Sequence, residues 1–100
     1  MTVEFDIIGA SASQALRVDF TDLVIAGWAG RDQAAIEHHI EELAAIGVPR
    51  PSATPLFYRV AANQLTQADR VQMVGEQTSG EVEAFVFSAG GVAYVSIASD

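Results

Sequence analysis

The 100-residue chain has no cysteine, only five lysine and arginine residues together, and no long hydrophobic run. Without cysteine it can form neither disulfides nor thiolate metal sites, and it has no cysteine nucleophile. A formal net charge of −8 leaves no basic stripe for a phosphate backbone, so we expect no nucleic-acid partner. No segment reaches the roughly 20 apolar residues that cross a bilayer, and Glu4 and Asp6 stand where a signal peptide would be basic. We therefore expect a cytoplasmic protein without a membrane partner.

Apolar residues are plentiful enough for a packed core. Half of the chain is hydrophobic, and its composition is not that of a disordered protein. The chain contains no internal repeat, low-complexity tract or linker. Residues 1–100 are therefore expected to form a single domain or the amino-terminal fragment of a longer β-rich domain.

Extended segments dominate the chain. A turn of small residues at Gly9–Ser13 separates the first two predicted strands, and Gly90-Gly91 marks a hairpin turn between the last two. The predicted strands cover residues 3–8, 15–20, 23–28, 56–60, 71–74, 81–87 and 92–97.

One main helix is predicted over about residues 33–46. Asp32 is placed to cap its amino terminus, and Gly47 is placed to end it, with two prolines close behind. Apolar residues recur on one face of this helix, whereas His38 points away from that face. The helix and the strands together indicate an α+β fold, mostly antiparallel, with one helix packed on the strands.

Three carboxylates are predicted to share one patch. The alternation over residues 81–87 places Glu81 and Glu83 on the same strand face. If the hairpin turns at Gly90-Gly91, the numbers of opposite residues sum to 181, and Asp100 lies across from Glu81. Like charges placed opposite each other are destabilising, and a divalent cation (Mg²⁺, Mn²⁺ or Ca²⁺) would remove that cost. The alternative is a solvated strand face that binds no metal.

A histidine on the predicted helix has a carboxylate within reach. His39 lies beside the apolar face, three residues before Glu42, and such pairs meet on a helix. Glu42 could fix the imidazole tautomer, as a general base or water activator requires. Three alternatives remain open: an exposed His38–Glu41 pair, a metal held by His38 and Glu42, and an incidental surface ion pair.

Several familiar motifs are missing. The absence of H-E-x-x-H excludes a zincin site, and no complete G-x-S-x-G elbow is present. Gly75 and Gly80 have the spacing of a phosphate-binding loop, but Glu81-Val82 follows where lysine and serine or threonine are needed.

The order of four segments resembles the fumarylacetoacetate hydrolase superfamily. Gly30-Arg31 followed by the His39–Glu42 segment looks like its G-R-N-Y and H-x-x-E lid. The segment P-L-F-Y-R at 55–59 looks like its strand ending F-L-K-P, with arginine replacing lysine. The segment E-V-E-A-F-V at 81–86 is similar to its E-x-E-L-A-V-V metal strand, and Ser99-Asp100 resembles the start of N-D-V-T-A-R. Over about residues 22–100, the sequence is most similar to the domain-of-unknown-function family 2848, whose members are longer than this chain.

This resemblance implies a metal-dependent hydrolase or lyase that acts on small 2-oxo acids by C–C bond hydrolysis, decarboxylation, hydration or dehydration. It implies that Glu81, Glu83 and Asp100 ligate a divalent cation, with Mg²⁺ first and Mn²⁺ or Ca²⁺ as alternatives. His39, held by Glu42, would then activate or deliver water. The resemblance also implies that Arg31 or Arg59 binds the carboxylate of the small-molecule substrate, and that the fold is a β-rich roll forming homodimers.

The chain also departs from this superfamily. His39 lies farther from Gly30-Arg31 than the pattern expects, and only 16 residues separate Glu83 from Asp100. Val60 replaces a proline, and the catalytic lysine of the superfamily lies beyond Asp100. We therefore expect an incomplete roll that does not turn over substrate alone, with activity in a longer protein. The alternative function is a non-catalytic α+β module for binding or assembly.

Overall fold

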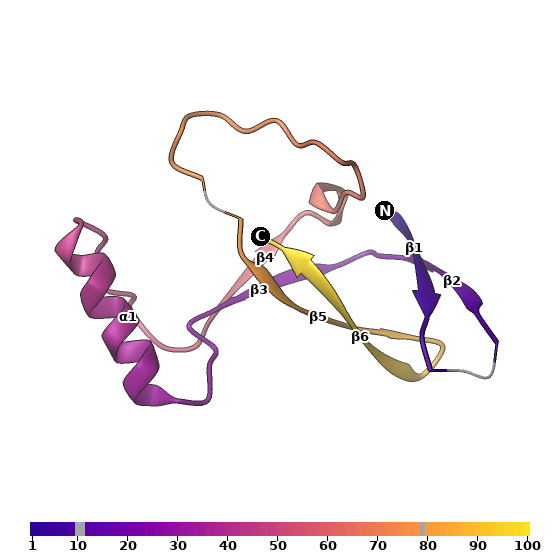
Figure 1. Ribbon diagram of the computed structural model, residues 1–100, viewed down its shortest axis with the longest axis horizontal. Helices are drawn as coiled ribbons and strands as arrows, with labels where there is room; N and C mark the ends of the chain where they lie inside the picture. Colours follow the sequence, from indigo (N-terminus) through magenta and orange to yellow (C-terminus); the bar gives the residue numbers. More distant parts are fainter. Residues whose placement is uncertain (10–11, 79) are drawn as a thin grey trace. The chain divides into compact units, whose positions relative to one another are not determined.

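The computed structural model describes residues 1–9, 12–78 and 80–100 (Figure 1). Over these residues the chain forms one α-helix, a short 3₁₀ helix and three antiparallel two-stranded sheets. The predicted α+β class with a majority of strand is confirmed. The chain divides into two compact units. We call Met1–Thr21 with Ala62–Asp100 the terminal unit, and Asp22–Ala61 the central unit.

The terminal unit begins with a hairpin of β1 (Thr2–Ile7) and β2 (Gln14–Asp19). Both strands begin and end one residue earlier than predicted from the sequence. The pairing places Val3 opposite Val18, and both side chains are buried. Of the turn predicted at Gly9–Ser13, residues 10 and 11 lie outside the described part of the chain.

The second hairpin of the terminal unit consists of β5 (Val82–Ala89) and β6 (Val92–Ser99). Gly90 and Gly91 join the two strands with φ angles of +57° and +78°, in the left-handed region that favours glycine. Ala89 pairs with Val92 and Val82 pairs with Ser99, so the numbers of opposite residues sum to 181. The register predicted from the Gly-Gly turn is confirmed.

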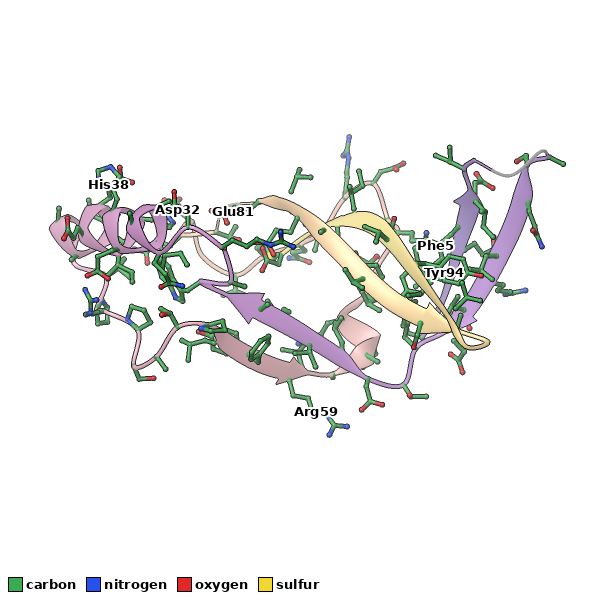
Figure 2. The ribbon with its side chains drawn as sticks, turned by 90° about the horizontal axis from the view of Figure 1, so that it is seen from below. Phe5, Asp32, His38, Arg59, Glu81 and Tyr94 are labelled. Atoms are coloured by element: carbon green, nitrogen blue, oxygen red, sulfur yellow. The ribbon has the colours of Figure 1, made fainter. Side chains whose placement is uncertain are left out.

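Aromatic rings pack the two hairpins of the terminal unit together. Phe87 on β5 is only 8% exposed, and its ring stacks on Phe5 of β1 with a centroid distance of 4.6 Å. Phe20 and Tyr94 contact the same ring, at 5.4 and 5.3 Å. Figure 2 shows Phe5 and Tyr94 where the hairpins meet. The odd-numbered face of β5, which also carries Glu83, is therefore fixed toward this aromatic core.

The opposite face of the second hairpin is apolar as well, but it is exposed. The exposed fractions of its largest side chains lie between 65% and 79%. They are Val82, Val86, Val95 and Ile97. Strands with two apolar faces are typical of sheets covered on both sides, so this face has the composition of a covered surface.

The central unit contains an antiparallel strand pair and the helix, which lies between the two strands in sequence. Strand β3 (Leu23–Gly27) pairs with β4 (Leu56–Val60), with Leu23 opposite Val60. Helix α1 (Gln33–Ala45) buries Ile36 and Ile40. Both strands and the helix were predicted, with Trp28 lying just outside β3. Among the described residues, no helix is long and apolar enough to span a membrane.

Both ends of α1 have the caps that the sequence predicts. The Asp32 carboxylate accepts hydrogen bonds from the backbone N–H groups of Ala34 and Ala35, at 3.0 and 3.2 Å. At the other end Gly47 has φ +91°, and the Val48 N–H donates to the Leu43 carbonyl. This bonding satisfies carbonyls that the helix leaves unpaired, and glycine permits the left-handed turn.

The predicted strand at residues 71–74 is wrong. After η1 (Ala62–Gln64) the chain runs to β5 without a described strand, and Val71, Met73 and Val74 are exposed. A strand needs a partner for its backbone, and the structure describes none beside this segment. The loop is instead anchored to β1 by the side-chain amide of Gln67. This amide accepts a hydrogen bond from the backbone N–H of Glu4 and donates one to the backbone carbonyl of Glu4.

Candidate functional site

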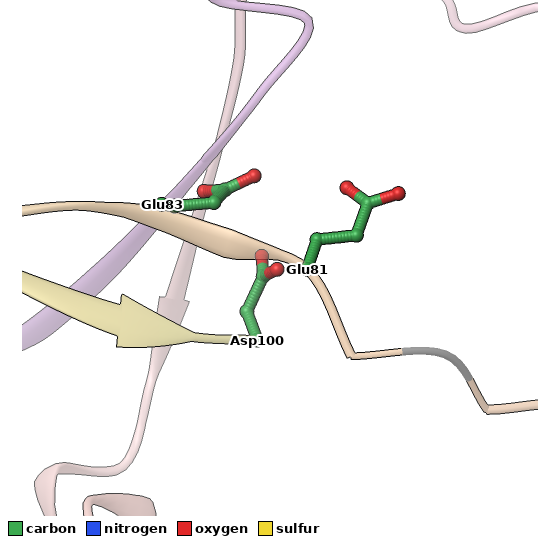
Figure 3. Close-up of side chains that lie close together, drawn as sticks. All are labelled: Glu81, Glu83 and Asp100. Atoms are coloured by element: carbon green, nitrogen blue, oxygen red, sulfur yellow. The ribbon is translucent and has the colours of Figure 1, made fainter.

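The structure brings together Glu81, Glu83 and Asp100, which we call the carboxylate cluster. Each residue offers one carboxylate oxygen, and these three oxygens lie within 4.8 Å of one another (Figure 3). The hairpin register explains the grouping, because Val82 opposite Ser99 leaves Glu81 and Asp100 one residue beyond the last pair. The three carboxylates therefore lie together, as predicted from the register in which the numbers of paired residues sum to 181. Metal binding by the carboxylate cluster stays a prediction.

At the open end of the hairpin, beside this cluster, Gly80 lies close to Ser99. A Cβ added at Gly80 would lie 3.1 Å from the hydroxyl oxygen of Ser99, closer than ordinary van der Waals contact. Glycine at this position therefore lets the chain enter β5 close to the end of β6. The two strand ends that carry the carboxylates are held near each other as a result.

The cluster is electrostatically unfavourable without a counter-charge. Burial raises the pKa of the Glu83 carboxyl above its ordinary value, and repulsion from Asp100 and Glu81 raises it further. All three residues are exposed, so solvent weakens this repulsion without abolishing it. A cation would be favoured at this position, although exposed acidic groups also occur together without one.

The donor set of the cluster defines which cation would fit. It consists of carboxylate oxygens alone, the ligands preferred by Mg²⁺, Mn²⁺ and Ca²⁺. Solvent exposure also suits Mg²⁺, which usually keeps several of its waters. These residues fit a hard divalent cation better than zinc in a structural site, which favours nitrogen and sulfur ligands.

Glu42 on α1 is shared by two histidines. The predicted partner, His39, places Nδ1 3.6 Å from one Glu42 oxygen, and His38 places Nε2 only 2.8 Å from the other. His38 projects into solvent as predicted, with 73% of its side chain exposed (Figure 2). The predicted His39–Glu42 pair is present, but the shorter approach belongs to His38. At 3.6 Å the contact between His39 and Glu42 is longer than a direct hydrogen bond, so the attraction between the two groups is electrostatic.

Trp28 is a part of this histidine cluster that the sequence did not reveal. Its ring centroid lies 5.3 Å from that of His39, with an angle of 48° between the two planes. The contact joins the residue after β3 to the helix, so no short-range spacing signals it. The only sequence cue is that Trp28 is the sole tryptophan of the chain.

The two arginines predicted to bind substrate have different surroundings. The Arg59 guanidinium on β4 pairs with the Asp22 carboxylate, and 77% of its side chain is exposed. A substrate carboxylate would have to compete with Asp22 for the Arg59 guanidinium. Arg31 is exposed directly before the helix cap. The binding role predicted for each arginine stays a prediction.

A third arginine ties α1 to the loop that follows it. Arg50 donates a hydrogen bond of 2.6 Å to Glu37, and this bond lowers the pKa of the Glu37 carboxyl. The same contact raises the pKa of Arg50. Both groups are therefore ionised at neutral pH and hold the loop against the helix surface.

The predicted site residues are divided between the two units. The carboxylate cluster belongs to the terminal unit, whereas His39, Glu42, Arg31 and Arg59 belong to the central unit. The structure assembles the three carboxylates in one place and the two histidines around Glu42 in another. Joint action of the two groups stays a prediction.

Comparison with known proteins gives one match. The family model described as "Protein of unknown function (DUF2848)" matches residues 26–100. No curated protein and no solved structure matches the chain. The matched range includes the carboxylate cluster, the histidines and Trp28, and it covers three quarters of the sequence. The chain therefore belongs to the DUF2848 family.

Proposed function

We propose that the carboxylate cluster is the divalent-cation site of a hydrolase or lyase that acts on small 2-oxo acids. The observation that carries this proposal is the convergence of three carboxylate oxygens within 4.8 Å at the open end of one hairpin. The raised pKa of Glu83 supports it, because the cluster is costly without a neutralising charge. The reaction class comes from the motif order that resembles the fumarylacetoacetate hydrolase superfamily, whose β-rich roll we propose as the complete fold.

Glu81, Glu83 and Asp100 would hold the cation, with Mg²⁺ the best fit and Mn²⁺ or Ca²⁺ the alternatives. When bound, such a cation supplies Lewis-acid stabilisation of the negative charge that develops on the oxygens of a 2-oxo acid. The aromatic residues Phe85 and Phe87 lie on the same face of β5 as Glu83 and would limit water on that side of a bound substrate. Lower water content there strengthens the attraction between the carboxylates and a positive charge.

His39 is the proposed proton acceptor. Glu42 lies beside its Nδ1, which favours the tautomer that keeps the other ring nitrogen, Nε2, free to take a proton from water. The exposed guanidinium of Arg31 or Arg59 would bind the substrate carboxylate in a two-pronged arrangement. We further propose a cytoplasmic homodimer, which the likeness to the superfamily favours.

A non-catalytic α+β module for binding or assembly is the second candidate function. The exposed apolar face of the second hairpin favours it, since Val82, Val86, Val95 and Ile97 form a surface typical of covered sheets. In this case the carboxylates would serve solubility and the hairpin face would be the functional part.

Turnover measurements decide between the two functions. Because this chain alone is not expected to turn over substrate, the assay uses the complete roll proposed above. It is tested against a panel of 2-oxo and 2,4-dioxo acids with and without Mg²⁺, together with Glu83→Gln and Glu76→Gln. Glu76 is an exposed carboxylate outside the cluster and serves as the matched control. The enzyme proposal expects Mg²⁺-dependent turnover that Glu83→Gln removes and Glu76→Gln retains. Turnover that is absent with every acid, or that is equal in the two variants, would contradict it.

A further inference from the structure

Trp28 has an unusual backbone for a large aromatic residue. Its φ angle is +57°, in the left-handed region that bulky side chains rarely adopt. Immediately before it, a Cβ added at Gly27 would lie 3.3 Å from the Tyr58 ring. The chain therefore leaves β3 through a close backbone approach and a strained residue. Strain of this kind persists only where the surrounding structure holds the residue in place.

The strained backbone carries the indole to the ring of His39. The two centroids are 5.3 Å apart and the planes are inclined by 48°, so the indole limits how the imidazole can turn. Glu42 approaches the imidazole from its Nδ1 side, at 3.6 Å. Among the described residues, none makes a hydrogen bond to Nε2 of His39. The imidazole is thus restricted on its face and on one edge, and its second nitrogen is left available.

His38 provides an internal contrast. Its Nε2 lies 2.8 Å from Glu42, within hydrogen-bond distance, and it takes no part in the Trp28 contact. A neutral imidazole donates from the nitrogen that faces a carboxylate. Adjacent histidines that present different nitrogens to the same carboxylate should therefore carry their protons on different nitrogens.

We propose that Trp28 is a positioning residue that keeps the Nδ1 edge of His39 toward Glu42 and leaves Nε2 as the proton acceptor. This inference rests on the role of His39 in the proposed function and names the group that orients it. In the neutral forms, His39 has its proton on Nδ1 and His38 has its proton on Nε2. Without the indole, the His39 ring turns freely and loses this preference.

Long-range ¹H–¹⁵N NMR of the full chain at pH above 8 reads the tautomers directly, because histidine side chains are largely neutral there. The two histidines are assigned with His38→Gln and His39→Gln. We expect the Nδ1–H pattern for His39 and the Nε2–H pattern for His38. In Trp28→Gly, which relieves the strained φ and removes the ring, the His39 pattern becomes a mixture while that of His38 is unchanged. Trp28→Phe, which restores a ring, is expected to recover the His39 pattern.

Fluorescence provides an independent measurement, because Trp28 is the only tryptophan. A protonated imidazole in contact with an indole quenches its emission. Emission is therefore expected to be weaker at acid pH, where a histidine carries a proton, than at alkaline pH. This difference should persist in His38→Gln and disappear in His39→Gln, while Glu42 stays in place in both variants.

Two results would overturn the proposal. One is an Nε2–H pattern for His39 in the unmodified protein, and the other is a pH-dependent emission that survives in His39→Gln. Neither measurement needs Trp28→Gly to fold. Neither needs a cation or a substrate, so failure of the turnover assay leaves these readouts intact and the two proposals fail separately.

Discussion

One carboxylate oxygen of Glu83 lies within 4.8 Å of a carboxylate oxygen of Asp100, although the full β5–β6 hairpin separates the two residues in sequence. The pairing register produces this proximity, because Glu83 lies opposite Ala98 and the strands run antiparallel. A register shift of one residue would turn the β6 side chains to the other face. The Gly90-Gly91 turn therefore determines whether the cluster exists.

The raised pKa of Glu83 predicts how stability depends on pH without metal. The pKa of the Glu83 carboxyl is higher in the folded state than in the unfolded state. Between these two pKa values the folded state therefore binds more protons than the unfolded state. The free energy of unfolding contributed by this group therefore falls as the pH rises through that window. The contribution of Glu83 to stability is most favourable below the pKa that its carboxyl has in the unfolded state. Urea unfolding in EDTA at a series of pH values would measure it.

Glu83→Gln should remove that pH-dependent component and raise the free energy of unfolding at neutral pH by about 0.2–1 kcal/mol, as relief of like-charge repulsion does. Glu76→Gln, which lies outside the cluster, should leave both quantities unchanged. An unaltered pH profile in Glu83→Gln would show that the cluster does not strain the folded state.

The aromatic core of the terminal unit gives a prediction on packing. Phe87→Ala should lower the free energy of unfolding by about 3–5 kcal/mol, because it removes a buried ring at the centre of the aromatic contacts. Val86→Ala on the exposed face is the control, and a change below about 0.5 kcal/mol is expected. Equal losses in the two variants, measured by urea unfolding, would refute the assigned faces of β5.

The cap of α1 gives a prediction on the central unit. Asp32→Ala should destabilise the helix by about 1 kcal/mol, because two backbone N–H groups lose their acceptor. Asp32→Ser retains an oxygen that can accept these bonds and should keep most of the stability. Circular dichroism of urea unfolding measures both variants, and an Asp32→Ala variant as stable as the parent would show that the cap is not needed.

Local patterns predicted the hairpins and the helix well. The Gly90-Gly91 dipeptide and strict alternation determine the β5–β6 register, and Asp32 and Gly47 mark the ends of the helix. The segment at 71–74, in which three of the four residues are apolar, carried no such signal of pairing. Apolar residues alone do not supply a partner strand. Sequence reasoning therefore worked where a turn or cap accompanied the pattern.

The candidate site was predictable only in part. The carboxylate cluster follows from period two and one turn, and the His39–Glu42 pair follows from helix spacing. The approach of Trp28 to His39 depends on how β3 passes into α1. The Arg59–Asp22 pair joins the end of β4 to the residue before β3, two segments that α1 separates in sequence. Neither contact has a fixed sequence spacing, so the chain alone does not reveal it.

Cation binding by the carboxylate cluster is tested most directly by titrating Mg²⁺ and Mn²⁺ into the metal-free protein, with calorimetry and thermal unfolding as readouts. A cation that binds only the folded state stabilises it by about 2.7 kcal/mol when its concentration is 100 times the Kd. We predict saturable binding and a higher Tm in the parent and in Glu76→Gln, with both lost in Glu83→Gln and Asp100→Asn. No saturable binding, or the same rise in Tm in all four proteins, would contradict a cation site at Glu81, Glu83 and Asp100.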